Sequence, residues 1–108
     1  MIFEQGDIIK VNFNPSIGHE PAKLRPAIVV SNFDFNISNS MTIVCPITNR
    51  LKPFFLHFEL PDDFDVSGCI VTEQIRALDL EARKAVKIAT LDEVTLNRIL
   101  SCIRSFFD

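Results

Sequence analysis

Along most of the chain, apolar residues alternate with polar ones or form short uninterrupted runs, and both patterns are typical of β-strands. The clearest alternation starts after Gly6 and Asp7 and continues to Phe13. The patterns predict short strands at 6–14, 26–31, 41–47, 54–60, 68–74 (with an extension to 78) and 85–89. Turn-forming or polar residues fill the connections at 15–24, 32–40, 49–53, 61–67 and 79–84, and the last of these is expected to be a short helical turn.

The period of the pattern changes near the C-terminus. Apolar residues there fall three or four positions apart, at Leu96, Ile99, Leu100, Ile103 and Phe107. This spacing places them on one side of an α-helix. Thr90 and Glu93 fit a capping box, whose side chains satisfy free amides at the start of a helix. We therefore expect a terminal helix of about four turns that packs one apolar side on the rest of the protein.

Strands this short, without long helices between them, indicate a mainly antiparallel sheet or a small barrel. The expected class is mainly β (α+β), with the C-terminal helix as its clearest helical element. A chain of 108 residues with 47% hydrophobic and 23% charged residues fits one globular domain spanning 1–108. No apolar run approaches the roughly 20 residues that span a bilayer. The first residues also lack the pattern of a signal peptide, so we expect a cytoplasmic protein without a membrane partner.

The net charge of −3 argues against a protein that coats nucleic acid with a broad basic surface. It still allows an enzyme that grips a few nucleotides in a local basic groove. Cys45, Cys69 and Cys102 lie in apolar runs without metal-ligand spacing, so they are expected to be free, buried thiols. The sequence suggests neither a metal site nor a cofactor.

Four segments, in order, give a resemblance that covers nearly the whole chain. They run from Gly6 to Pro15, from Gly18 through Arg25 to Ser31, from Val44 to Thr48, and from Gly68 to Asp79. Together they resemble the MazF/PemK toxin family. The resemblance implies a small, SH3-like, partly open β-barrel with a C-terminal α-helix, the fold shared by MazF and CcdB toxins. It also implies a homodimer and a cognate antitoxin whose disordered C-terminal segment covers the RNA groove, with promoter DNA bound only through the antitoxin.

The activity implied by the resemblance is sequence-specific cleavage of single-stranded RNA, chiefly mRNA, without a metal. Such cleavage uses the 2′-hydroxyl as nucleophile and needs a proton acceptor, a proton donor and positive charge at the phosphate. Arg25 matches the family's active-site arginine, and its role is charge stabilisation because a guanidinium does not lose its proton. Thr48 matches the family's hydroxyl-bearing residue. His19 and Glu20 are the candidate proton carriers, although either can instead be an ordinary loop residue or, for Glu20, an ion-pair partner of Arg25.

RNA contacts beyond the reaction centre are expected from Gln74 and Arg76, which resemble family positions near the groove; the alternative is that both are ordinary exposed strand residues. Lys23 and Arg50 lie in loops beside the matched segments and can attract phosphate, although Arg50 can equally be an ordinary solvated loop residue. Glu73 is the nearest match to an acidic catalytic residue of some relatives, and we interpret it as a solvent-facing strand residue. His57 lies in an alternating strand and is interpreted as structural.

Two other functions stay open at this stage. A CcdB-like gyrase poison has the same fold but acts through C-terminal residues that include a tryptophan, and this chain has no Trp and ends in Ser-Phe-Phe-Asp. A catalytically inactive module that only binds RNA or the antitoxin is the second alternative. The retention of Arg25 and Thr48 argues against this loss of activity.

Overall fold

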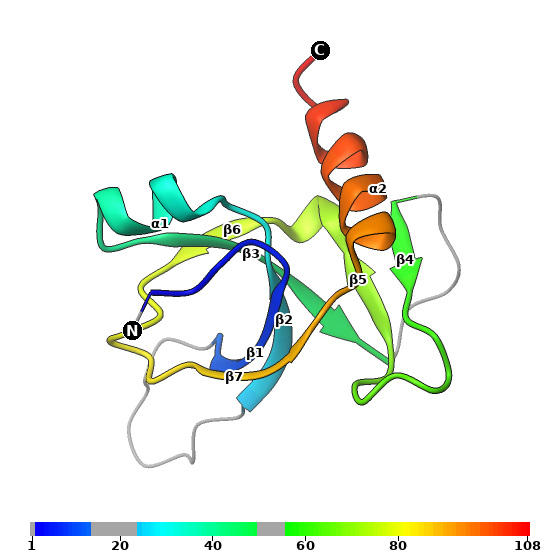
Figure 1. The fold of residues 1–108 in the computed structure, drawn as a ribbon, viewed down its shortest axis with the longest axis horizontal. Helices are drawn as coiled ribbons and strands as arrows, with labels where there is room; N and C mark the ends of the chain where they lie inside the picture. Colours follow the sequence, from blue (N-terminus) through cyan, green and yellow to red (C-terminus); the bar gives the residue numbers. More distant parts are fainter. Residues whose placement is uncertain (1, 14–23, 50–55) are drawn as a thin grey trace.

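The computed structural model describes residues 2–13, 24–49 and 56–108, and within them the chain forms mainly short strands (Figure 1). The strands are β1 (Asp7–Asn12), β2 (Leu24–Val29), β3 (Thr42–Thr48), β4 (His57–Glu59), β5 (Cys69–Val71), β6 (Arg76–Leu78) and β7 (Val86–Thr90). The helices are α1 (Phe33–Ser38) and α2 (Glu93–Arg104), and a 3₁₀ turn, η1, spans Thr72–Gln74. The mainly β class and the C-terminal helix are therefore confirmed.

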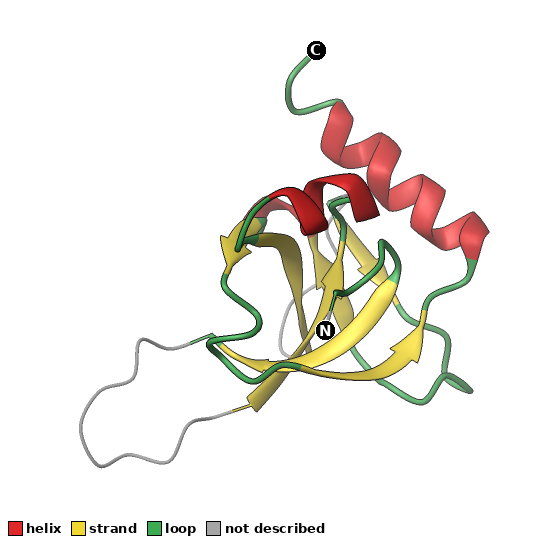
Figure 2. Ribbon diagram, turned by 60° about the vertical axis from the view of Figure 1, so that its left-hand side comes forward, coloured by secondary structure: helices red, strands yellow, loops and turns green. Residues whose placement is uncertain are grey.

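The strands form an open antiparallel sheet in the order β4-β5-β3-β2-β1-β7, and β6 also pairs with β3. Strand β3 is the hub of this arrangement because it pairs with β2, β5 and β6. Figure 2 shows the strands curling around one another, with α2 lying beside them. The long β3 thus connects the half of the sheet that holds β1 and β2 to the half that holds β4 and β5.

Alternation along the central strands gives the protein two buried clusters. Ile8, Ile28 and Cys45 are register partners across β1, β2 and β3, and they belong to the cluster that α2 covers. Ile9 and Ala27 are also partners, and they point to the opposite side. This second cluster comprises Phe3, Ile9, Val11, Ala27, Val29, Val44, Leu78 and Leu80. Because side chains on a strand alternate between faces, one strand can supply both clusters.

Helix α2 buries the predicted stripe of Leu96, Ile99, Leu100 and Ile103. Two details of the prediction are wrong. The N-cap is Asp92, whose carboxylate accepts hydrogen bonds from the amide and hydroxyl of Thr95, both at 2.9 Å. Thr90 cannot cap because it ends β7 opposite Asp7. The helix has 12 residues and ends at Arg104, so Phe107 lies beyond it and is 79% exposed.

The connection at 32–40, expected to be turns, contains helix α1. The Asn32 side chain caps it by accepting a hydrogen bond from the amide of Phe35 at 2.9 Å. Asn36 is buried in the helix, and its side-chain amide donates to the carbonyl oxygens of Phe3 at 2.8 Å and Ser31 at 3.2 Å. These contacts fix a short helix whose apolar side chains Phe33, Phe35 and Ile37 stay exposed (these three alternate as they would in a strand).

The apolar run at 68–78 does not form one strand. It divides into β5 and β6, with η1 between them. Residues 50–55 lie outside the described part of the chain, and in the rest of the predicted strand at 54–60 the structure forms β4 over His57–Glu59. The 79–84 segment is a turn, as expected, with Lys84 in a left-handed conformation (φ 55°).

The three cysteines are free, with Cys45 buried and Cys69 and Cys102 half-buried. Burial, together with the nearby Cys102 and Glu73, raises the pKa of Cys45 to about 12. This thiol therefore stays protonated at neutral pH and acts as a small apolar side chain. Among the helices that the structure describes, none is long and apolar enough to cross a membrane.

Candidate nucleic-acid interface

A groove of about 520 Å³ opens where β2, β3 and η1 meet. Its walls are formed by Phe13, Arg25, Pro46, Gln74, Ile75 and Arg76. These residues come from four separate parts of the sequence. Three of them, Arg25, Gln74 and Arg76, are residues that the sequence singled out for RNA.

Strand register explains why these side chains converge. Arg25 lies opposite Val11 on β1, and Arg76 lies opposite Val44 on β3. Val11 and Val44 both belong to the second buried cluster, and residues directly opposite each other in a sheet point to the same face. Pro46 is two positions beyond Val44 and shares its face. The groove is therefore the open end of the second cluster, where charged and polar side chains replace apolar ones.

Thr48 lies on this same face, two residues beyond Pro46 on β3. The register of β2 and β3 pairs Ala27 with Pro46. Continued by two residues, this register sets Arg25 opposite Thr48, a relationship in which Cβ atoms are typically about 4.5–5.5 Å apart. Thr48 is half-buried and pairs with Cys69 on β5 on its other side. The fold thus brings the two residues predicted for the reaction to neighbouring strands.

The hairpin of β4 and β5 fixes the end of β3 that carries Thr48. Gly68, with φ +124°, comes so close that a Cβ atom there would lie 2.8 Å from the Thr48 carbonyl oxygen and 2.9 Å from Oδ1 of Asn49. The Ser67 hydroxyl donates a hydrogen bond to the same Asn49 oxygen at 3.4 Å. Only glycine permits both this backbone conformation and this close approach.

Two guanidinium groups make the groove locally positive in a chain whose net charge is −3. The Arg76 guanidinium carbon lies 5.6 Å from the centre of the Phe13 ring, a cation–π contact that holds the charge over an aromatic face. The ion pairs within the described residues are His57–Glu73 and Lys87–Asp7. Within that part of the chain, neither groove arginine is neutralised by a carboxylate.

These groups suit an RNA strand. Guanidinium forks bind phosphate oxygens in a bidentate way, and a glutamine amide can both donate and accept at a base edge. An aromatic ring beside an arginine offers a stacking surface. The remaining predicted residues, His19, Glu20, Lys23 and Arg50, lie outside the described residues.

The groove also contains residues that the sequence reasoning missed, namely Phe13, Pro46 and Ile75. The alternation of Ile9, Val11 and Phe13 could have placed Phe13 on the face of Arg25. Nothing local to Ile75 signals its position, because η1 interrupts a run that looks continuous.

Glu73 differs from its prediction as a strand residue. It lies in η1, and its Oε2 is 2.8 Å from Nε2 of His57. The His57 side chain is only 7% exposed, whereas that of Glu73 is 37% exposed. The two residues are 16 positions apart, and neither lines the groove.

An open antiparallel sheet, a C-terminal helix and a groove lined by two arginines define a small β-protein with a locally positive groove. A family model described as PemK-like, MazF-like toxin of type II toxin-antitoxin system matches residues 4–107. The chain therefore belongs to the PemK/MazF toxin family.

Named relatives agree with this assignment. The chain is 39% identical over 104 residues to the endoribonuclease toxin ChpB of Escherichia coli K12, covering 91% of this chain and 89% of that protein. It is 32% identical over 88 residues to the endoribonuclease toxin MazF of the same organism, covering 82% and 78%. A crystal structure of MazE–MazF from Deinococcus radiodurans superposes with a TM-score of 0.88 at 29% identity, covering 98% of this chain and 96% of that one.

Proposed function

We propose that this protein is an endoribonuclease toxin that cleaves single-stranded RNA, chiefly mRNA, at specific sequences and without a metal ion. The observation that carries the proposal is the groove in which Arg25 and Arg76 stand without a carboxylate partner among the described residues, with Thr48 on the face of Arg25. The relatives named endoribonuclease toxins support the activity.

In the proposed reaction, the 2′-hydroxyl oxygen of one nucleotide attacks the adjacent phosphorus. The bond to the 5′-oxygen of the next nucleotide breaks, leaving a 2′,3′-cyclic phosphate and a 5′-hydroxyl end. Arg25 donates hydrogen bonds to the non-bridging oxygens as their charge grows, and the Thr48 hydroxyl donates to the same phosphate. His19 and Glu20 remain our candidates for taking a proton from the 2′-hydroxyl and giving one to the leaving oxygen.

The rest of the groove positions the strand. Gln74 is suited to reading a base edge, and Arg76, held against Phe13, is suited to a neighbouring phosphate or base. Lys23 and Arg50 are proposed to attract the phosphates on either side. Since the reacting groups must be held close and aligned, this positioning contributes to rate as well as to affinity.

The proposed partners are a second copy of the chain and a cognate antitoxin. Helix α1 exposes three apolar side chains, Phe33, Phe35 and Ile37. Neighbouring exposed apolar groups of this kind are typical of a surface that a partner covers, and they therefore support an assembly. Structures of MazE–MazF complexes among the similar folds support the antitoxin. Its disordered C-terminal segment would compete with RNA for the groove, and promoter DNA would be bound through the antitoxin. The site of action is the cytoplasm, where mRNA is translated.

The test is to incubate the purified protein with a long single-stranded RNA in EDTA and to map the cut ends, with Arg25→Ala and Arg104→Ala in parallel. Arg104 is a matched control because it is an exposed arginine in the last turn of α2 and does not line the groove. We expect discrete cuts with wild type and Arg104→Ala, and none with Arg25→Ala. Intact RNA from folded wild-type protein would refute the nuclease and favour a module that only binds.

A further inference from the structure

The orientation of the turn η1 determines one wall of the groove. Gln74 is its last residue, and Ile75 and Arg76 follow directly, so three of the six lining residues belong to the turn or come straight after it. Arg76 is held in addition by its pairing with Val44 on β3. The turn has three residues and one internal backbone bond, from the Ile75 amide to the Thr72 carbonyl oxygen at 3.3 Å. So short a 3₁₀ segment has little stability of its own and takes its position from outside contacts.

The turn contacts β3 and also α2, where the Cys102 sulfur lies 3.7 Å from the Thr72 hydroxyl. Its shortest side-chain hydrogen bonds, however, go to the start of β4. The carbonyl oxygen of Leu56 accepts hydrogen bonds from the Thr72 amide at 3.3 Å and from the Thr72 hydroxyl at 2.7 Å. One residue further along each segment, Nε2 of His57 lies 2.8 Å from Oε2 of Glu73. Thr72 is fully buried and the His57 side chain nearly so. The pair therefore sits at the base of the turn, with its histidine shielded from solvent and its carboxylate partly exposed.

The pair also controls where a carboxylate lies. Glu73 is adjacent to Gln74 in the sequence, yet it turns towards His57 and does not line the groove. If it were released, its negative charge would become available to the groove arginines and would compete with RNA phosphate. The contact with His57 therefore serves both the shape and the charge of the site.

We infer that His57 and Glu73 form a latch that sets Gln74 and Arg76 in place for RNA and keeps the Glu73 carboxylate out of the groove. Both are positioning residues. This inference rests on the proposed function for its effect on RNA, and on the contacts above for its effect on the turn.

The kinetic test uses His57→Leu, Glu73→Ala, the double variant and Glu73→Gln, which keeps a side chain able to bond to His57. His57→Leu frees the carboxylate, so we expect KM for RNA to rise roughly tenfold while kcat stays within about twofold. Glu73→Ala should raise KM less, and the double variant should match Glu73→Ala. Glu73→Gln should behave almost as wild type.

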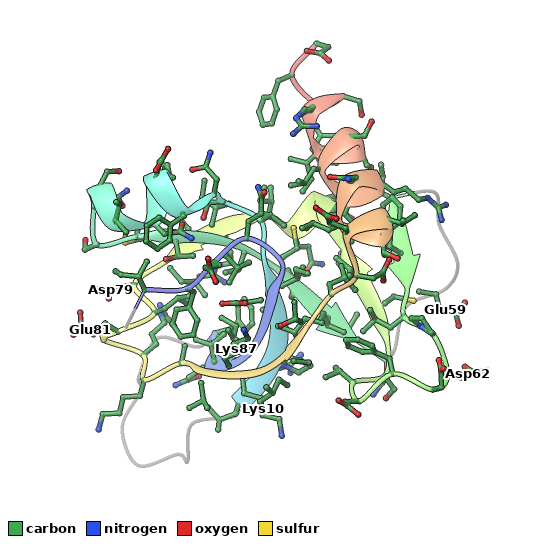
Figure 3. The ribbon with its side chains drawn as sticks, in the orientation of Figure 1. Lys10, Glu59, Asp62, Asp79, Glu81 and Lys87 are labelled. Carbon is green, nitrogen blue, oxygen red and sulfur yellow. The ribbon has the colours of Figure 1, made fainter. Side chains whose placement is uncertain are left out.

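Lys87→Gln is the control for mere loss of an ion pair. Its amine lies 3.0 Å from the carboxylate of Asp7, a side chain that is 7% exposed. Lys87 lies on β7 and His57 on β4, at the two ends of the strand order, and Figure 3 shows Lys87 well apart from Glu59, which ends β4. This variant should lose thermal stability with KM unchanged.

Three outcomes would overturn the latch. If His57→Leu behaves as Lys87→Gln does, with lower stability and an unchanged KM, the pair is only structural. If Glu73→Gln abolishes kcat while His57→Leu does not, Glu73 is a proton carrier. If the KM effects of the two single variants simply multiply in the double variant, the residues act independently.

A spectroscopic measurement separates the latch from the nuclease. In the RNA-free protein, the latch predicts that His57→Leu shifts the backbone amide resonances of Gln74 and Arg76, whereas Lys87→Gln leaves them in place. Unmoved resonances would refute the latch even if RNA is cut. Shifted resonances would support it even if wild type cuts no RNA and the proposed function fails.

Discussion

Gly68→Ala is expected to damage both stability and catalysis, because Gly68 packs on the end of β3 that carries Thr48. Its φ of +124° is a conformation that alanine adopts only under strain, at a cost of about 1–3 kcal/mol. The new methyl group would also lie 2.8 Å from the Thr48 carbonyl oxygen. Overpacking of this kind costs about another 1–3 kcal/mol. Because the hairpin end can relax in part, we expect a total loss of about 2–4 kcal/mol.

Gly6→Ala separates the two contributions. Gly6 also has a positive φ, +96°, but among the described residues its Cβ would meet the flexible end of Leu96, at 3.1 Å from Cδ2, and no backbone atom. Gly6→Ala should therefore lose stability because of the strained backbone conformation, with a smaller contribution from steric overlap. It should also leave the neighbourhood of Thr48 unchanged.

Urea unfolding measures the difference. With m of about 1–3 kcal/mol per M, the midpoint of Gly68→Ala should fall by roughly 1–2 M, and that of Gly6→Ala by less, with m unchanged. RNA cleavage should fall for Gly68→Ala at urea-free conditions where the variant is fully folded, and should persist for Gly6→Ala. Equal stabilities of the two variants, or full cleavage by Gly68→Ala, would refute the reasoning.

Three further predictions concern the core, pH and salt. Ile99→Ala removes a fully buried side chain of α2 and should cost about 2–5 kcal/mol in urea unfolding; a loss below about 1 kcal/mol would contradict the described packing. Hydrogen bonds from the amide and hydroxyl of Thr95 lower the pKa of Asp92 below its usual 3.8. The ionised carboxylate therefore stabilises the folded protein fully at pH values well above 3.8, and this stabilisation is lost as pH falls through the lower pKa of the folded state. The difference in Tm between wild type and Asp92→Asn should accordingly become smaller in acid. A difference that grows in acid would contradict this prediction. RNA affinity should fall with salt, and Arg76→Ala should reduce the slope of log K against log salt by about 0.7 if the arginine binds one phosphate; an unchanged slope would exclude that contact.

The strands and the terminal helix could be predicted because their signals are local. Partial apolar alternation gives β1, a mostly apolar run gives β3, and the spacing of Leu96, Ile99 and Ile103 gives α2. The sequence pattern predicts the wrong start for this helix because two residues of types that can cap a helix, Thr90 and Asp92, stand two positions apart. The pairing of Thr90 with Asp7, a residue more than eighty positions away, decides between them.

Helix α1 could not be predicted from the sequence for a similar reason, because contacts with residues outside the segment stabilise it. Its residues include three apolar side chains at alternate positions and several asparagines and serines, a composition that favours turns. The bonds from Asn36 to Phe3 and Ser31 stabilise the helix from outside, and no pattern within the segment reports them.

The candidate site, too, could be predicted only in part from the sequence. Arg25, Thr48, Gln74 and Arg76 were named by resemblance, and pattern alone gave no reason to place them together. The pairing of β2 with β1 and β3, and of β3 with β6, brings these site residues together from distant parts of the sequence. It also brings Phe13 into the groove, although this residue looked like an ordinary core residue in the sequence. Contacts between β4 and η1 are equally invisible in the sequence.

The most direct test of the central claim replaces one ribose by deoxyribose. An RNA oligonucleotide carrying a mapped cut site is compared, in EDTA, with the same oligonucleotide lacking only the 2′-hydroxyl beside the scissile phosphate. We predict that the all-ribose strand is cut to a 2′,3′-cyclic phosphate and a 5′-hydroxyl, and that the substituted strand binds but stays intact. Cleavage of the substituted strand at the same bond would contradict the proposed mechanism.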